Sequence, residues 1–123
     1  MNRCDVVIVN FNAGVFLRDA VESALRSGLV ANIYVVDNAS TDGSLALLPS
    51  EHDSQIIIIR NTTNVGFAAA CNIGLMRSAA ENVLVLNPDC LMMVSVIDHL
   101  ISALRSADRI GMAGPLVLNA DDS

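Results

Sequence analysis

Short apolar runs alternate along this chain with segments in which apolar residues recur at helical spacing. The apolar runs predict strands at residues 5–9, 33–37, 55–59 and 83–86. The helical spacing predicts helices at residues 14–27, 44–48, 67–78 and 94–106. A last apolar stretch, residues 110–118, predicts a further strand that Gly114 and Pro115 interrupt. Successive strand-then-helix units are typical of a parallel, doubly wound sheet with right-handed crossovers.

The pattern therefore predicts an α/β protein of three layers, with a mostly parallel sheet between helices on both faces. With 123 residues, the chain is predicted to form a single domain over residues 1–123. Hydrophobic residues make up 53% of the chain, which suits strands that are covered on both sides. No apolar run approaches the roughly 20 residues that cross a bilayer, so no membrane span is predicted.

Charge and cysteine usage narrow the class of protein. The formal net charge is −6 and the chain contains no lysine, so its seven cations are all arginines. A surface of this kind repels phosphate backbones, which argues against nucleic-acid binding. The three cysteines, Cys4, Cys71 and Cys90, are widely spaced and include no Cys-x-x-Cys pair. They are predicted to be buried free thiols in a reducing, cytoplasmic compartment.

Polar residues follow the predicted strands and predict a binding site. Three strands are followed by polar clusters: Asn10 and Asn12, then Asp37 to Asp42, then Asn87 and Asp89. Because parallel strands end at one edge of the sheet, these clusters should converge on one crevice. Asn64 and Gly66 come before the helix predicted at residues 67–78, whose N-terminus favours an anion or a polar ring edge.

Two of these carboxylates have an alternative interpretation. Asp42 is placed equally well to cap the following helix or to bind a ligand. Asp37 could simply terminate its strand, but the recurrence of polar residues after the other strands favours a site.

The glycines and the acidic charge restrict the ligand. A Walker loop requires a lysine, and the glycines here never take the Gly-x-Gly-x-x-Gly spacing of dinucleotide folds. A diphosphate in an acidic crevice would be repelled unless a divalent cation lay between it and the carboxylates. Mg²⁺ or Mn²⁺ suits such a site, and Asp89 is the best candidate ligand. The alternative is that Asp89 is a turn or cap residue after Pro88.

Four motifs in order carry a resemblance to a known family. They are Val-Val-Ile-Val-Asn-Phe-Asn, Val-Val-Asp-Asn-Ala-Ser-Thr-Asp-Gly-Ser, Asn-Val-Gly-Phe-Ala-Ala-Ala-Cys-Asn-Ile-Gly and Leu-Asn-Pro-Asp. Together they resemble the family 2 glycosyltransferases of the GT-A fold, which is the nucleotide-diphospho-sugar transferase fold. They look most like the rhamnosyltransferase-like branch, and the resemblance covers nearly the whole chain.

The resemblance implies roles for particular residues. Asp37 would bind the base or ribose of the nucleotide. The other nucleotide-binding residues implied are Asn10, Asn12, Asn38, Asn64, Gly66 and Asn72. Asp89 would be the last carboxylate of the Asp-x-Asp metal motif. Asn87 takes the first position of that motif and would lie near the donor phosphate or sugar.

The resemblance also implies an activity. Such an enzyme transfers a sugar, with rhamnose as one candidate, from a nucleoside-diphosphate sugar to a saccharide or lipid-linked acceptor, with inversion. Members are about twice this long or more, so the chain would be a truncated, donor-binding portion. Its general base is expected beyond residue 123, and the exposed edge predicts self-association.

Two further expectations remain open at this point. The expected location is cytoplasmic, free or peripheral at the inner face of the membrane. The alternative to a transferase is a non-catalytic nucleotide-binding or interaction module that retains the fold.

Overall fold

A parallel four-stranded sheet forms the centre of the molecule. The computed structural model describes residues 3–50, 53–119 and 121. The strands are β1 (Cys4–Asn10), β2 (Val30–Asp37), β3 (Ile56–Arg60) and β4 (Val83–Val85). Their order across the sheet is β3-β2-β1-β4, and each neighbouring pair is parallel. All four predicted strands are confirmed, with bounds that differ from the prediction by no more than three residues.

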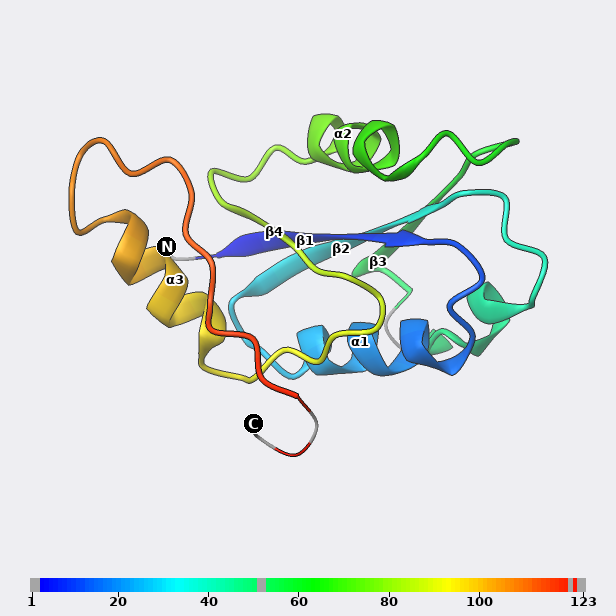
Figure 1. The fold of residues 1–123 in the computed structure, drawn as a ribbon, viewed down its shortest axis with the longest axis horizontal. Coiled ribbons are helices and arrows are strands. Elements are labelled where there is room, and N and C mark those ends of the chain that lie inside the picture. The colour runs from blue at the N-terminus through cyan, green and yellow to red at the C-terminus, as the bar shows by residue number, and fades with distance from the viewer. Residues whose placement is uncertain (1–2, 51–52, 120, 122–123) are drawn as a thin grey trace.

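Helices cover both faces of this sheet, as Figure 1 shows. The α-helices are α1 (Val15–Leu25), α2 (Phe67–Arg77) and α3 (Val96–Leu104). Helix α2 lies on one face, while α1 and α3 lie on the other. The three-layer α/β class predicted from the sequence is therefore confirmed. None of the helices in the described part of the chain is long and apolar enough to span a bilayer.

Alternation along the buried strands divides the core between the two faces. Val6 and Ile8 of β1 face α1 and α3 and belong to the larger cluster, with Leu17 and Ile97 from the helices. The intervening residues face α2 and form a smaller cluster, listed here: Val7, Val9, Tyr34, Val36, Ala70 and Cys71. Because successive side chains of a strand point to opposite faces, a fully apolar strand supplies both cores at once.

Two of the predicted elements are wrong. Residues 44–48 do not form an α-helix but a single 3₁₀ turn, η1 (Ser44–Leu47). Its bonds run from Ala46 N to the Gly43 carbonyl (3.1 Å) and from Leu48 N to the Leu45 carbonyl (3.3 Å). Pro49 follows directly, which leaves too few residues for a second turn.

The predicted strand over residues 110–118 is also absent, since this segment has no regular structure and is exposed throughout. A strand requires a hydrogen-bonded neighbour, and within the described residues the sheet ends at β4. Gly114 and Pro115 further weaken any strand that the apolar residues would favour.

The topology places the polar loops at one edge. The loops after β1, β2 and β3 all lie at the right-hand side of Figure 1, where the N-termini of α1 and α2 also lie. Parallel strands require this arrangement, because every strand ends at the same edge and the next helix begins there. Five of the predicted site residues lie in the strand ends and loops at this carboxyl edge: Asn10, Asn12, Asp37, Asn64 and Gly66.

Candidate functional site

The ends of β1 and β2 bring the first two polar clusters into contact. Asn10 and Asp37 are partners in the parallel register of the two strands. The backbone N–H of Asn38 donates to the Asn10 carbonyl at 2.8 Å, which continues the ladder past the end of β2. Two polar side chains are therefore held next to each other by backbone hydrogen bonds.

Asn10 is the centre of a buried hydrogen-bond network. Its Nδ2 lies 2.8 Å from Asp37 Oδ1, 2.8 Å from Ser44 Oγ and 3.1 Å from Ser40 Oγ. The other oxygen of Asp37, Oδ2, accepts the Ser40 backbone N–H at 3.0 Å. Asn10 has no exposed surface and Asp37 is 3% exposed. The network fixes the polar turn after β2 against the end of β1.

A second set of bonds joins the loop after β1 to the same turn. The backbone N–H of Asn12 donates to Ser40 Oγ at 2.9 Å, and Asn12 Oδ1 accepts the Thr41 N–H at 2.8 Å. Asn12 adopts a positive φ of 51°, a conformation that Asn tolerates better than most residues. These bonds define the shape of an exposed polar rim.

Asp42 bridges this rim to the start of α1. Its Oδ2 accepts the Gly14 N–H at 2.9 Å and its Oδ1 accepts the Ser44 N–H at 3.0 Å. Hydrogen bonds from the Ser44 hydroxyl and from the Ser44 and Gly14 N–H groups lower the pKa of Asp42. Both oxygens therefore have structural partners, which favours the turn-stabilising interpretation of Asp42.

Asn38 holds the loop after β3 in place. Its Nδ2 donates to the Gly66 carbonyl at 3.2 Å, while its Oδ1 accepts from Asn61 Nδ2 at 3.0 Å and from the Val65 N–H at 3.3 Å. The Gly66 N–H in turn donates to Asn64 Oδ1 at 2.9 Å. Asn38 is 2% exposed, so its side chain determines the position of the start of α2.

Burial separates the predicted nucleotide-binding residues into two groups. Asn10, Asp37 and Asn38 are buried and bonded to other parts of the chain. Four others are exposed: Asn12, Asn64, Gly66 and Asn72. The structure brings Asn10, Asn12, Asp37 and the loop containing Asn64 and Gly66 together at one edge, and places Asn72 in the second turn of α2. The exposed residues are accessible to a ligand, and the buried residues hold the strand ends and loops around them in position.

Asn87 and Asp89 lie on an exposed turn after β4. The Cys90 N–H donates to the Asn87 carbonyl at 3.1 Å, and Cys90 Sγ lies 3.7 Å from Asp89 Oδ1. In the part of the chain that the structure describes, no three His, Cys, Asp or Glu side chains are grouped to hold a metal. A single exposed carboxylate still fits Mg²⁺ or Mn²⁺, because these ions commonly take one or two carboxylates together with phosphate and water oxygens.

Sequence reasoning missed several residues at this edge. Neither Ser40 nor Ser44 is among the individual residues that the sequence assigns to the site, yet both contact the buried Asn10 side chain. The role of Asn61 in binding Asn38 had no local signal, because it depends on the pairing of β2 with β3.

The three phenylalanines were also missed as a group. All three belong to the carboxyl edge and are more than half exposed: Phe11 (53%), Phe16 (59%) and Phe67 (53%). Phe11 follows β1, while Phe16 and Phe67 are in the first turns of α1 and α2. Large apolar side chains are usually buried, so this edge presents ring surface beside its polar groups.

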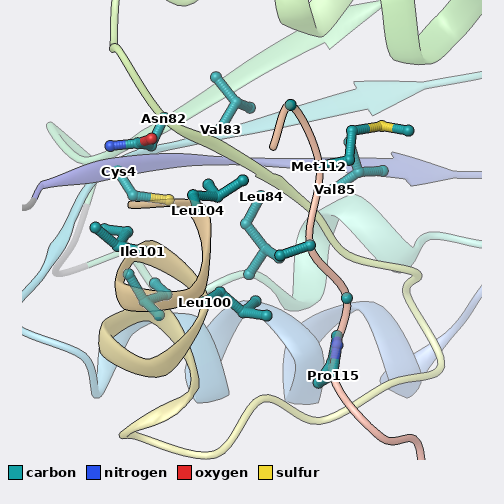
Figure 2. Close-up of a pocket in the computed structure, with 14 residues that line it drawn as sticks. Cys4, Asn82, Val83, Leu84, Val85, Leu100, Ile101, Leu104, Met112 and Pro115 are labelled. Atoms are coloured by element: carbon teal, nitrogen blue, oxygen red, sulfur yellow. The ribbon is translucent and has the colours of Figure 1, made fainter. Parts of the chain in front are cut away.

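An apolar cavity lies elsewhere, beside β4. It has a volume of about 290 Å³ and is lined by β4, α3 and residues 111–115. Figure 2 shows Leu84, Leu100 and Met112 around this space, with Asn82 as its polar lining residue. It contains no carboxylate and no cation, so it does not match the predicted nucleotide site.

Comparison with known proteins shows the family and the fold. The model of glycosyl transferase family 2 matches residues 5–122. No curated protein matches the chain significantly. Among solved structures, the mannosyltransferase PcManGT from Pyrobaculum calidifontis, in complex with GDP-Man and Mn²⁺, is similar with a TM-score of 0.77 and 20% identity. The match covers 85% of this chain and 32% of PcManGT.

A second similar structure is TarS 1-349 from S. aureus in complex with UDP. It has a TM-score of 0.73 and 16% identity over 93% of this chain and 38% of TarS 1-349. The chain thus spans about a third of the length of these structures. The likeness confirms the predicted fold, while identities this low show the fold alone.

Proposed function

This chain belongs to glycosyl transferase family 2, and we propose that it forms the donor-binding portion of a sugar transferase. The reaction would move a sugar from a nucleoside-diphosphate sugar to a saccharide or lipid-linked acceptor, with inversion at the anomeric carbon. The observation that carries this proposal is the carboxyl edge, where Asn10 and Asp37 organise an exposed polar rim. In open α/β sheets this edge is where ligands bind.

The exposed rim residues are proposed to contact the nucleotide. Asn12 and Asn64 offer side-chain amides, and Gly66 comes directly before the first residue of α2. Gly66 has a φ of 87°, a conformation that favours glycine over other residues. Asn10, Asp37 and Asn38 are proposed to support this surface. Asp37 is 3% exposed, so it would reach the base or ribose only through that small part of its surface.

A divalent cation is proposed to join the donor diphosphate to Asp89. The chain has a net charge of −6 and no lysine, so a cation is needed to offset repulsion between the diphosphate and the carboxylates. Mg²⁺ or Mn²⁺ would supply charge neutralisation on the departing diphosphate. Asp89 would hold the cation, and Asn87 would lie near the donor phosphate or sugar.

The donor sugar, the source of the general base and the location of the protein are also proposals. Rhamnose, supplied as a deoxythymidine-diphosphate sugar, is suggested by the resemblance of the motifs to the rhamnosyltransferase-like branch. The general base is expected from the remaining part of a longer transferase, because the chain spans about a third of the similar structures. A cytoplasmic site of action, free or peripheral at the membrane, is proposed from the three free cysteines.

Calorimetric titration tests the donor site. The folded chain is titrated with UDP and dTDP, each with and without Mn²⁺. We expect binding that requires Mn²⁺ and falls about tenfold or more in Asp89→Asn. Asp108→Asn, which removes another exposed carboxylate after α3, is the control and should bind as the parent does. Binding that ignores both Mn²⁺ and Asp89 would contradict the metal assignment.

A second candidate function is a non-catalytic nucleotide-binding or interaction module that retains the fold. The polar rim that Asn10 and Asp37 organise would serve such a module as well as a transferase. The two functions are separated by measuring donor hydrolysis and transfer with the purified chain. Turnover that disappears in Asp89→Asn would exclude the non-catalytic module.

A further inference from the structure

The arginines of this chain are distributed unevenly about the sheet. Three lie away from the carboxyl edge, before β1 or at the C-terminal ends of helices: Arg3, Arg26 and Arg77. A cation at a helix C-terminus has a structural explanation in the helix dipole. Arg105 and Arg109 follow α3. Arg18, in the first turn of α1, is held in a salt bridge to Asp19 at 2.9 Å.

Arg60 is different from these residues. It is the last residue of β3, at the carboxyl edge, and its side chain is exposed. Within residues 3–50, 53–119 and 121, its guanidinium makes no hydrogen bond or ion pair. No helix C-terminus accounts for its position, because it precedes the loop that leads into the N-terminus of α2.

The backbone of Arg60 is nevertheless held firmly. Arg60 is the register partner of Asp37 in the parallel pair of β2 and β3. The next residue, Asn61, donates its N–H to the Asp37 carbonyl at 2.8 Å, and Asn61 Nδ2 donates to Asn38 at 3.0 Å. Because its backbone is fixed and its guanidinium has no partner among the described residues, Arg60 is suited to contact a ligand.

Alternation places Arg60 on the same face of the sheet as Asp37. Ile56 of β3 and Ile33 of β2 both belong to the core under α1, and residues two and four positions further along share that face. Arg60 and Asp37 are therefore neighbours on the α1 side at the carboxyl edge. The Arg60 side chain extends from the outermost strand, next to the buried Asn10 and Asp37 pair.

The strand order indicates which part of the nucleotide reaches Arg60. Asp89 follows β4, and β3 is the strand farthest from β4 in the order β3-β2-β1-β4. With about 4.8 Å between strands, the two strands are roughly 14 Å apart. A diphosphate held beside Asp89 would direct the nucleoside across β1 and β2, so the base would arrive at the end of β3.

We propose that Arg60 determines the base specificity of the donor site by donating to O4 of a pyrimidine or to O6 of a purine. This inference rests on the proposed donor-binding function. A guanidinium carries only N–H donors. It can therefore pair with O4 of uracil or thymine and with O6 of guanine, where cytosine and adenine carry amino donors instead. The donor would accordingly have uracil, thymine or guanine as its base.

Nucleotide titrations test this assignment. The parent chain is titrated in Mn²⁺ with UDP, dTDP, GDP, CDP and ADP, and we expect at least one keto-base nucleotide to bind about tenfold more tightly than CDP and ADP. Arg60→Gln should reduce that advantage to threefold or less while leaving the weak binding of CDP and ADP unchanged. Arg60→Lys keeps the charge but lacks the planar fork, and should also lose most of the preference. Arg109→Gln is the matched control, since Arg109 is exposed and follows α3.

Each outcome has one meaning. An equal loss for all five nucleotides in Arg60→Gln would identify a phosphate or general charge effect and overturn base recognition. Unchanged affinities in Arg60→Gln would overturn the inference while leaving the donor site intact. If the folded parent binds no nucleotide at all, the proposed function fails and the inference fails with it.

Discussion

Replacing Gly74 with alanine tests the packing that positions the candidate site. Gly74 is buried in α2, on the face that packs against the sheet. A Cβ atom at this position would lie 2.6 Å from Val7 Cγ1, 3.1 Å from Val7 Cγ2 and 3.2 Å from Val36 Cγ2. Val7 and Val36 have no exposed surface and are β-branched, so neither side chain has another rotamer within easy reach. The helix itself would have to move outward by about 1 Å to restore ordinary contacts.

Two effects of opposite sign determine how much Gly74→Ala changes the free energy of unfolding. Alanine is more favourable than glycine inside a helix by about 1 kcal/mol. Overpacking of a buried contact costs about 1–3 kcal/mol, and two rigid valines place this site toward the upper end of that range. We therefore expect Gly74→Ala to lower the free energy of unfolding by about 1–2 kcal/mol. Helix propensity alone would predict that Gly74→Ala raises the free energy of unfolding.

Urea unfolding followed by far-UV circular dichroism measures this change, since the chain has no tryptophan. Gly28→Ala is the matched control, because a Cβ at Gly28 meets nothing within 4 Å and its φ is not positive. That variant should be as stable as the parent or more stable by up to about 1 kcal/mol. A Gly74→Ala chain as stable as the parent would refute the packing argument.

Three further predictions concern charge, thiols and association. Hydrogen bonds from Ser44 lower the pKa of Asp42 in the folded state, so the ionised Asp42 stabilises the fold. Asp42→Asn should therefore reduce stability fully above the unfolded pKa of about 3.9, and this difference should disappear as the pH falls through the lower folded pKa. Urea midpoints of parent and variant that differ equally at all pH values would contradict this prediction. Burial raises the pKa of all three thiols, and Asp89 raises that of Cys90 further, but Cys90 is partly exposed whereas Cys4 and Cys71 are buried. A disulfide reagent followed by mass spectrometry should therefore modify Cys90 first, and equally fast labelling of all three would count against the packing described here. The apolar side chains exposed near β4 predict self-association, which light scattering across a concentration series detects as a rising mass.

The helices and strands show where local pattern is sufficient. The first four apolar runs form their predicted strands, because apolar runs of this kind are stable when they are covered on both faces. Pattern failed at residues 44–48 and 110–118. In the first case, the space between Gly43 and Pro49 allows only a 3₁₀ turn. In the second, none of the strands in the described part of the chain pairs with the apolar residues. A strand forms only when a second strand pairs with it, so the sequence of one segment alone cannot predict it.

In the candidate site too, some features follow from the sequence and others only from the tertiary structure. From the sequence alone, the polar residues after each strand could be assigned to one edge, because parallel topology forces all the strand ends together. The separation of Asn10, Asp37 and Asn38 as buried supports from the exposed Asn12 and Asn64 could not be assigned. Burial depends on which strands and loops cover a residue, and these come from distant parts of the chain.

The sequence by itself determined the α/β class, the four strands and the edge at which polar groups gather, since all three follow from local periodicity and from the rule that parallel strands end together. Only the tertiary structure decided that Asn10 bonds to Asp37 and Ser44, and that Arg60 lies beside Asp37 with no partner for its guanidinium among the described residues. The physical reason is that hydrogen-bond partners are selected by strand order and register, which arise from the packing of the whole chain.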